Sequence, residues 1–226
     1  LMRFGRVFQQ TYTRFLDLQK AEAQAREAQI EAALERVRSK TMAMRNSEDV
    51  GETVATLFGQ LVILGIETIR CGVGIIYESQ QMEVWTAKKI KNKKAELIIG
   101  RLNVSKHPLM QGVFRGWKNK DISFSYELKD QDLVDYFTIL TNSPEYHIGY
   151  DIASLPRQQF NNDFYFDEGA LFSFSKEQLS DEAFQIFRRF AGVFGQTYRR
   201  YLDLQKAEAQ VREAQIEAAI EKVRSR

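Results

Sequence analysis

The amino-acid sequence predicts an α+β fold: an antiparallel sheet of about six strands with packed helices, flanked by a long helix at each end. Three observations lead to this prediction. Residues 3–40 and 189–226 are rich in helix-forming residues and have nearly the same sequence. Several segments between them alternate apolar and polar residues with the two-residue period of strands. Other segments repeat their apolar residues at the spacing of an amphipathic helix.

The two terminal segments repeat each other at an offset of 186 residues, and 29 of their 38 aligned positions are identical. This period is far too long for a solenoid repeat and fits a whole domain plus a connecting helix. Residues 41–226 make up one full period, so we expect one unit of a tandem array whose partners include adjacent repeat units. The expected parts are an N-terminal signalling helix (1–45), a domain (46–179) and a C-terminal signalling helix (180–226).

Each terminal helix carries apolar rows with heptad-like spacing, in which Ala stands where a strong zipper would have Leu or Ile. The row with a strict period of seven predicts the seam of a parallel homodimeric coiled coil. A solvated spacer helix and a helix that packs back on its own core are the alternatives. The predicted seam consists of Leu16, Ala23, Ile30 and Val37 with their repeats Leu202, Ala209, Ile216 and Val223. A second row alternates steps of three and four and consists of Leu18, Ala21, Ala25, Ala28 and Ala32.

Turn residues and apolar periodicity divide the rest of the chain. In the first strand, Cys71, Val73 and Ile75 fall on one face, and Arg70, Gly72 and Gly74 fall on the other. Gly72 and Gly74 indicate a place where a backbone or a ligand comes close to the strand. Helices are expected at 47–64, 107–119, 130–140 and from 180, strands at 66–78, 82–89, 95–104, 121–128, 163–167 and 170–175, and irregular structure at 141–160.

A sheet-based core with entry and exit helices resembles the GAF domain. The stretch SKEQLSDEAFQIFRRFAGVFGQTYRRYLDL (175–204) is the most GAF-like part. The segment LDLQKAEAQAREAQIEAALERVRSK (16–40) resembles the signalling helices that join tandem GAF-like domains in large bacterial sensor proteins, often sensor histidine kinases. The resemblance implies a regulatory domain of two-component signal transduction with a downstream signalling domain in the same chain.

Two ligand types known in GAF domains are not expected. Bilin attachment uses a cysteine followed by His, whereas Cys71 is followed by Gly72. The cyclic-nucleotide signature Asn-Lys…Phe…Asp-Glu is only partly matched, because NNDFYFDEG lacks the Asn-Lys pair and has a different spacing. No cofactor is identified.

Composition excludes several classes of protein. A net charge of +2 does not indicate a bulk polyanion as partner, and the lysines of AKKIKNKK (87–94) read as a solvated hairpin tip with no nucleic-acid role. The single cysteine excludes an intrachain disulfide and fits a cytoplasmic location. No apolar run reaches the length of a membrane span, so no membrane contact is expected from this segment.

No combination of residues predicts catalysis or a metal site. The two histidines, His107 and His147, are 40 residues apart and lack ligand spacing, and no nucleophile–base pair is evident. Aromatic residues from several elements could instead line a small-molecule cavity, although plain core filling explains them too. The candidate ligand-binding residues are Cys71, Trp85, His107, Trp117, Tyr126 and Tyr146. We therefore expect a noncatalytic sensory module that relays a signal through dimeric helices; the alternative is a structural spacer without a ligand.

Overall fold

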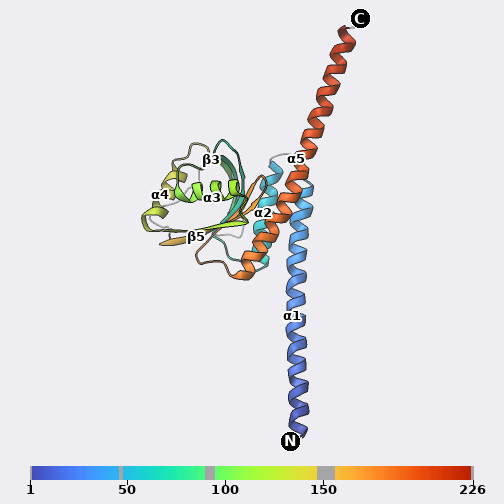
Figure 1. Cartoon of the computed structure of the whole chain (residues 1–226), viewed down its shortest axis with the longest axis vertical. Helices are drawn as coiled ribbons and strands as arrows, with labels where there is room; N and C mark the ends of the chain where they lie inside the picture. The colour runs from blue at the N-terminus through green and yellow to red at the C-terminus, as the bar shows by residue number, and fades with distance from the viewer. Residues whose placement is uncertain (1, 46–47, 90–94, 147–155, 225–226) are drawn as a thin grey trace.

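The computed structural model describes residues 2–45, 48–89, 95–146 and 156–224. A rounded body lies beside two long helices that project from it in opposite directions, and these helices carry the two ends of the chain (Figure 1). The elements in chain order are α1 (Met2–Met42), α2 (Glu48–Ile63), β1 (Arg70–Ile76), β2 (Gln81–Lys89), β3 (Ala95–Asn103), α3 (Pro108–Asn119), β4 (Ser123–Lys129), α4 (Asp130–Thr141), β5 (Gln158–Phe166), β6 (Gly169–Ser175) and α5 (Asp181–Arg224).

The six strands form one sheet in the order β3-β2-β1-β6-β5-β4, and every neighbouring pair is antiparallel. Helices α2 and α5 cover one face of the sheet, and α3 and α4 cover the other. The predicted α+β class and the antiparallel sheet are confirmed. Because successive side chains of a strand point to opposite faces, each strand contributes to two separate cores. We call them the bundle core, on the side of α2 and α5, and the cavity-side core, on the side of α3 and α4.

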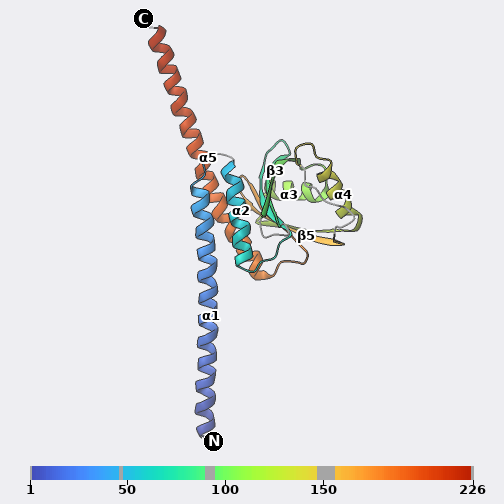
Figure 2. The same ribbon diagram turned by 180° about the vertical axis from the view of Figure 1, so that it is seen from behind.

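The carboxyl-terminal part of α1 packs against both α2 and α5, so three helices form a bundle on the sheet (Figure 2). Ile30, Ala33, Leu34 and Val37 are buried in the bundle core, because they fall on one face of α1 at helical spacing. Ion pairs flank this face: Arg26 contacts Glu182 at 2.7 Å. The packing therefore crosses positions 45 and 180, which we predicted as domain boundaries.

The predicted dimer seam is divided by this packing. Ile30 and Val37 lie inside the chain's own bundle and are not available to a second chain. Leu16 and Ala23 lie on the part of α1 below the bundle and are exposed, as are Ala209 and Ile216 on α5. Leu202 is half-buried against the bundle core, and the side chain of Val223 lies outside the described residues. The alternative of a helix that packs back on its own core therefore holds for residues 26–41 of α1.

Two strands differ from the expectation. β5 begins at Gln158, within a segment predicted to be irregular, and it includes Asn161, Asn162 and Asp163. The part missed is 158–162, before the strand predicted at 163–167, and it does not read as a strand because Asn is depleted in strands. β1 begins later than predicted, at Arg70. The predicted close approach of backbone at Gly72 is confirmed, because a Cβ atom there would overlap the backbone oxygen of Trp85 on β2 and also crowd the ring of Phe172.

We expect Ile30→Ala to lower the free energy of unfolding by about 2–4 kcal/mol, because it opens a cavity in the bundle core. Ile216→Ala is a matched control, since Ile216 is the repeat of Ile30 but is exposed. Urea denaturation should show almost no change for Ile216→Ala. Equal losses from the two substitutions would contradict the packing of α1 in the bundle.

Candidate functional site

The cavity-side face of the sheet carries polar side chains that are buried beneath α3 and α4. A small cavity of about 30 Å³ lies among them, enough for about one water molecule. Protein cores seldom bury this much polar surface without a ligand, a water or a specific hydrogen-bond network to satisfy it. The lining residues are Arg70, Val84, Leu109, Tyr136, Tyr146, Asn161, Asp163, Phe172 and Phe174.

Arg70 is the most unusual of these residues, since its side chain is almost fully buried. Its guanidinium donates a hydrogen bond from Nη2 to the hydroxyl of Tyr136 at 3.1 Å. The same group lies 3.8 Å from the ring centre of Phe174 and 5.1 Å from that of Phe137. A cation held over aromatic rings gains electrostatic energy that partly offsets its loss of water. Arg70 therefore provides a fixed positive charge at the floor of the cavity.

Asp163 lies on β5 on the same face, and burial raises its pKa to about 8 against a small opposing effect of Asn161. Asp163 Oδ2, Asn161 Oδ1 and Gln159 Oε1 are buried without a hydrogen-bond partner among the described residues. An unsatisfied buried acceptor costs about 1–3 kcal/mol. This row of unpaired oxygens on β5 is therefore a polar surface that a water or the polar groups of a ligand could satisfy.

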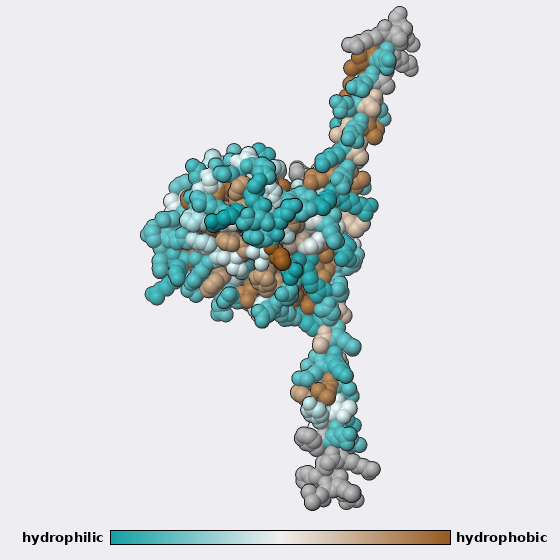
Figure 3. Space-filling model, viewed as in Figure 1, coloured by the Kyte–Doolittle hydropathy of each residue, from teal (hydrophilic) through white to brown (hydrophobic). Residues whose placement is uncertain are grey.

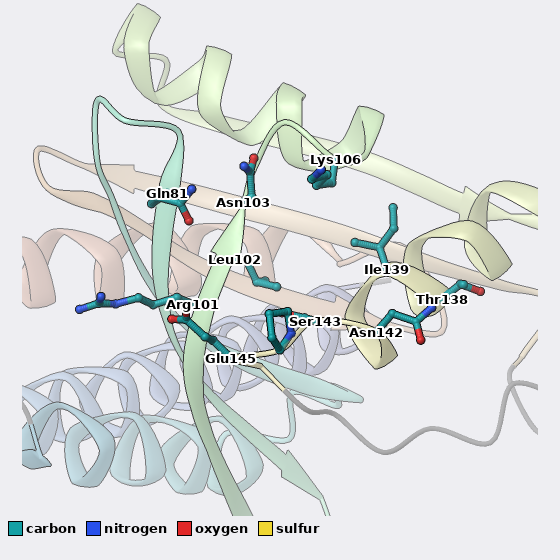
Figure 4. A pocket seen from close by; sticks show the side chains of 11 residues that line it. Gln81, Arg101, Leu102, Asn103, Lys106, Thr138, Ile139, Asn142, Ser143 and Glu145 are labelled. Atoms are coloured by element: carbon teal, nitrogen blue, oxygen red, sulfur yellow. The ribbon is translucent and has the colours of Figure 1, made fainter.

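A larger hollow of about 360 Å³ lies at the outer edge of the same side, between β3 and the end of α4 (Figure 4). We call it the outer groove. Leu102, Ile139 and Pro144 give it an apolar wall, and Arg101, Lys106 and Glu145 bring charges to its rim. Its volume lies within the range of small-molecule sites. The other lining residues are Gln81, Asn103, Thr138, Asn142 and Ser143.

Consecutive residues at the end of the described segment 95–146 line the two hollows, Glu145 the outer groove and Tyr146 the small cavity. Glu145 lines the groove and accepts a backbone hydrogen bond from Arg101 at 3.3 Å, which holds this segment along β3. The next residue, Tyr146, is buried and lines the small cavity, where its hydroxyl lies 2.5 Å from Thr86 Oγ1.

The other predicted site residues on this side have structural contacts. The Nδ1 atom of His107 caps α3 by accepting from the backbone N–H of Leu109, and its Nε2 atom lies 3.1 Å from the carbonyl oxygen of Asp132. Because Nδ1 accepts, the ring proton belongs on Nε2, which then donates to Asp132. The indole N–H of Trp117 donates to the carbonyl oxygen of Asp167, and Tyr126 lies beside His107. None of the three lines either hollow.

Cys71 and Trp85 lie on the opposite face of the sheet, in the bundle core. Cys71 follows the cavity residue Arg70, and Trp85 follows the cavity residue Val84. Because side chains alternate along a strand, both point to the other face, toward α2 and α5. The structure therefore does not bring them together with the other four candidates. Burial raises the pKa of the Cys71 thiol far above its usual value, so this thiol stays protonated.

Sequence reasoning missed Arg70, Asp163 and the outer groove. For Arg70 a signal existed: a charged residue stands at a position that alternates with Gly72 and Gly74 in an otherwise apolar strand. The outer groove had no such signal, because residues of β3 and α4 that are distant in sequence form it. Within the described ranges, no group of three or more His, Cys, Asp or Glu residues could hold a metal ion. No described helix is both long and apolar enough to cross a membrane.

The sequence matches no family model and no curated protein. Solved structures similar to the chain include GAF domains. The A. aeolicus nlh2 GAF domain in an inactive state has 9% identity and a TM-score of 0.47, with 80% of this chain and 99% of that chain covered. A GAF sensor protein from Burkholderia vietnamiensis has 13% identity and a TM-score of 0.41, with 77% and 98% covered. The phycoerythrobilin-bound GAF domain of a cyanobacterial phytochrome has 12% identity and a TM-score of 0.44, with 76% and 97% covered.

The raised pKa of Asp163 predicts a pH dependence of stability. Between about pH 4 and 8 the unfolded chain ionises this group while the folded chain keeps it protonated, so the folded state binds more protons. The free energy of unfolding should therefore fall as pH rises through this range, by up to about 1.4 kcal/mol per pH unit. Asp163→Asn should flatten the fall in urea denaturation between pH 5 and 8. The exposed-site control Asp17→Asn should keep it, and an unchanged slope in Asp163→Asn would contradict the assignment.

Proposed function

We propose that this chain is a noncatalytic, sensory GAF-like module in which the α3–α4 side of the sheet receives a ligand and the long helices carry the response. One observation supports this most. Adjacent residues of β1 reach both sides, with Arg70 at the small cavity and Cys71 buried in the bundle core. A displacement of β1 by a ligand would therefore change the packing under α2 and α5. Closely packed cores transmit such strain because they contain few voids.

The outer groove is the proposed entry site, and a small organic anion with an apolar part is the proposed class of ligand. Arg101 and Lys106 supply positive charge at the rim, while Leu102 and Ile139 offer apolar contact. Glu145 opposes the binding of an anion at one end, and Arg101 already lies 3.6 Å from Glu83. A carboxylate would thus have to compete for Arg101, which favours a bidentate anion.

We propose that the output runs through a parallel homodimer, with the second apolar row as its seam. That row (Leu18, Ala21, Ala25, Ala28 and Ala32) is exposed along its whole length. At about 100° per residue it lies on the side of α1 opposite to Ile30 and Val37, which the bundle uses. Small side chains let two helices slide or rotate at little cost in packing, as a relay requires. A histidine kinase is the proposed output domain, on the resemblance of residues 16–40 to signalling helices.

The alternative is a structural spacer without a ligand. The size of the small cavity favours it, because about 30 Å³ admits a water and no organic ligand as long as Tyr146 stays in place. The outer groove then would be a surface hollow only. The mass of the purified protein distinguishes the two proposals, because a bound ligand adds to it and a spacer has no added mass.

Native mass spectrometry of the purified protein tests the ligand. We expect a dimer with an added mass of a few hundred daltons, and we expect Ile139→Trp to lose that mass because the indole fills the outer groove. Gln131→Trp is the matched control, since Gln131 is exposed on the same helix and does not line the groove. A dimer without added mass would favour the spacer, and mass retained in Ile139→Trp would exclude the groove.

The dimer seam is tested by two identical substitutions on opposite sides of one helix. Ala28→Asp should raise the dimer dissociation constant by about tenfold or more, since it places a charge in the second row. Ala23→Asp belongs to the first row and should leave dimerisation unchanged, although both alanines are exposed in the single chain. Analytical ultracentrifugation measures both. The reverse order would restore the first row as the seam below the bundle.

A further inference from the structure

We propose that residues 212–224 of α5 are the first helix of another three-helix bundle, completed by the α2 and α5 of a second unit of this fold joined in tandem. The proposal depends on neither the ligand nor the dimer. Apolar side chains are exposed along both projecting helices, outside the rounded body (Figure 3). The repeat of 186 residues gives these side chains counterparts in the other terminal helix. Where the counterpart is buried, its neighbours show which elements cover that position.

The carboxyl-terminal end of α5 repeats the buried face of α1. Ile216 is 54% exposed, and its counterpart Ile30 is 4% exposed. Ile220 is 46% exposed, and its counterpart Leu34 is 3% exposed. An isolated helix gains nothing from β-branched residues on one stripe, since they lower its helix propensity. These two residues of α5 are therefore of the same apolar type as the buried face of α1, although they are exposed here.

The charges that flank the face are repeated too. Arg26 bonds Glu182 and also donates from Nη2 to the carbonyl oxygen of Leu64 at the end of α2. Arg189 lies 2.8 Å from Glu27 and 2.6 Å from Glu31. The counterparts of Arg26, Glu27 and Glu31 are Arg212, Glu213 and Glu217, with identity retained at all three. In this part of α5 the described ion pairs include none of these three residues. The surface therefore matches the acidic and basic positions of a second α5.

The amino-terminal end of α1 shows the converse relation. Tyr12 is 54% exposed, whereas its counterpart Tyr198 is 7% exposed and stacks on Phe194 in the bundle core. Phe15 is also exposed, and its counterpart Tyr201 packs against the same core. The start of α1 thus has the same aromatic residues that α5 packs against its own sheet. We expect the sheet of a preceding unit to cover them.

The occupant must be a unit fused in register and not a free second chain. In a free chain the groove between α2 and α5 already holds residues 26–41 of its own α1. In a fused unit α5 itself supplies that helix, so the groove is open to it and to no other segment. Between the two covered regions, Leu18 and its counterpart Leu204 are exposed in both helices. This middle stretch stays free for the homodimer seam.

The test compares the chain as it is with a two-unit chain, in which residues 41–226 follow Arg226. Hydrogen exchange followed by mass spectrometry reports on the amides of residues 212–224. We expect exchange in this segment to slow by about tenfold or more in the two-unit chain, because the helix no longer frays into solvent. Exchange at an unchanged rate would overturn the proposal.

Matched variants of the two-unit chain separate docking from a general effect of length. Ile216→Asp should restore fast exchange in residues 212–224, whereas Gln210→Asp should not, since Gln210 is exposed and its counterpart Gln24 belongs to neither apolar row. Arg212→Glu should also speed exchange, and Glu182→Arg in the second unit should slow it again. Equal effects of Ile216→Asp and Gln210→Asp would overturn the proposal. Loss of ligand mass or of the dimer in other experiments would leave these results unaffected.

Discussion

The packing of residues 26–41 of α1 against α2 and α5 is the contact on which the rest of the molecule depends. It joins the first helix to the last across nearly the whole chain, and ion pairs such as Arg26–Glu182 set its register. An Ala-rich helix of this type is marginal by itself, so its apolar stripe must be buried to keep it helical and in place. The same contact commits one face of α1 to its own chain, and it leaves the Ala-rich opposite face for any partner.

The sheet connects this bundle to the two hollows on its far side. A buried cation at Arg70 and a buried carboxyl at Asp163 are costly on a surface that could have been apolar. Aromatic rings around Arg70 and protonation of Asp163 reduce the cost without removing it. These polar groups, next to a strand whose alternate residues hold the bundle, are the structural basis of the proposed response to a ligand.

Much of the fold could be predicted from the sequence, because the strongest signals are local. The period of the apolar residues located most helices and strands, and Pro108 marked the start of α3. β5 was predicted too short because Asn161 and Asn162 oppose strand propensity, and the neighbouring strands β4 and β6 stabilise them there. The candidate site was less predictable. His107 and Trp117 fix α3 in place, Cys71 faces the bundle, and the outer groove exists only once β3 meets α4.

The repeat resolves what the heptad pattern left ambiguous. The period of seven in α1 does not show whether one partner covers all of these apolar residues or different partners cover different parts of the helix. The counterparts in the first row differ in burial, as Ile30 and Ile216 do, so this row does not have the same neighbours in the two helices. Aromatic residues of α5, Phe194 and Tyr198, and aliphatic residues of α1, Ile30 and Leu34, contribute to the same bundle core. The two copies of the repeat therefore bury different parts of one apolar stripe, and each copy leaves exposed the part that the other buries.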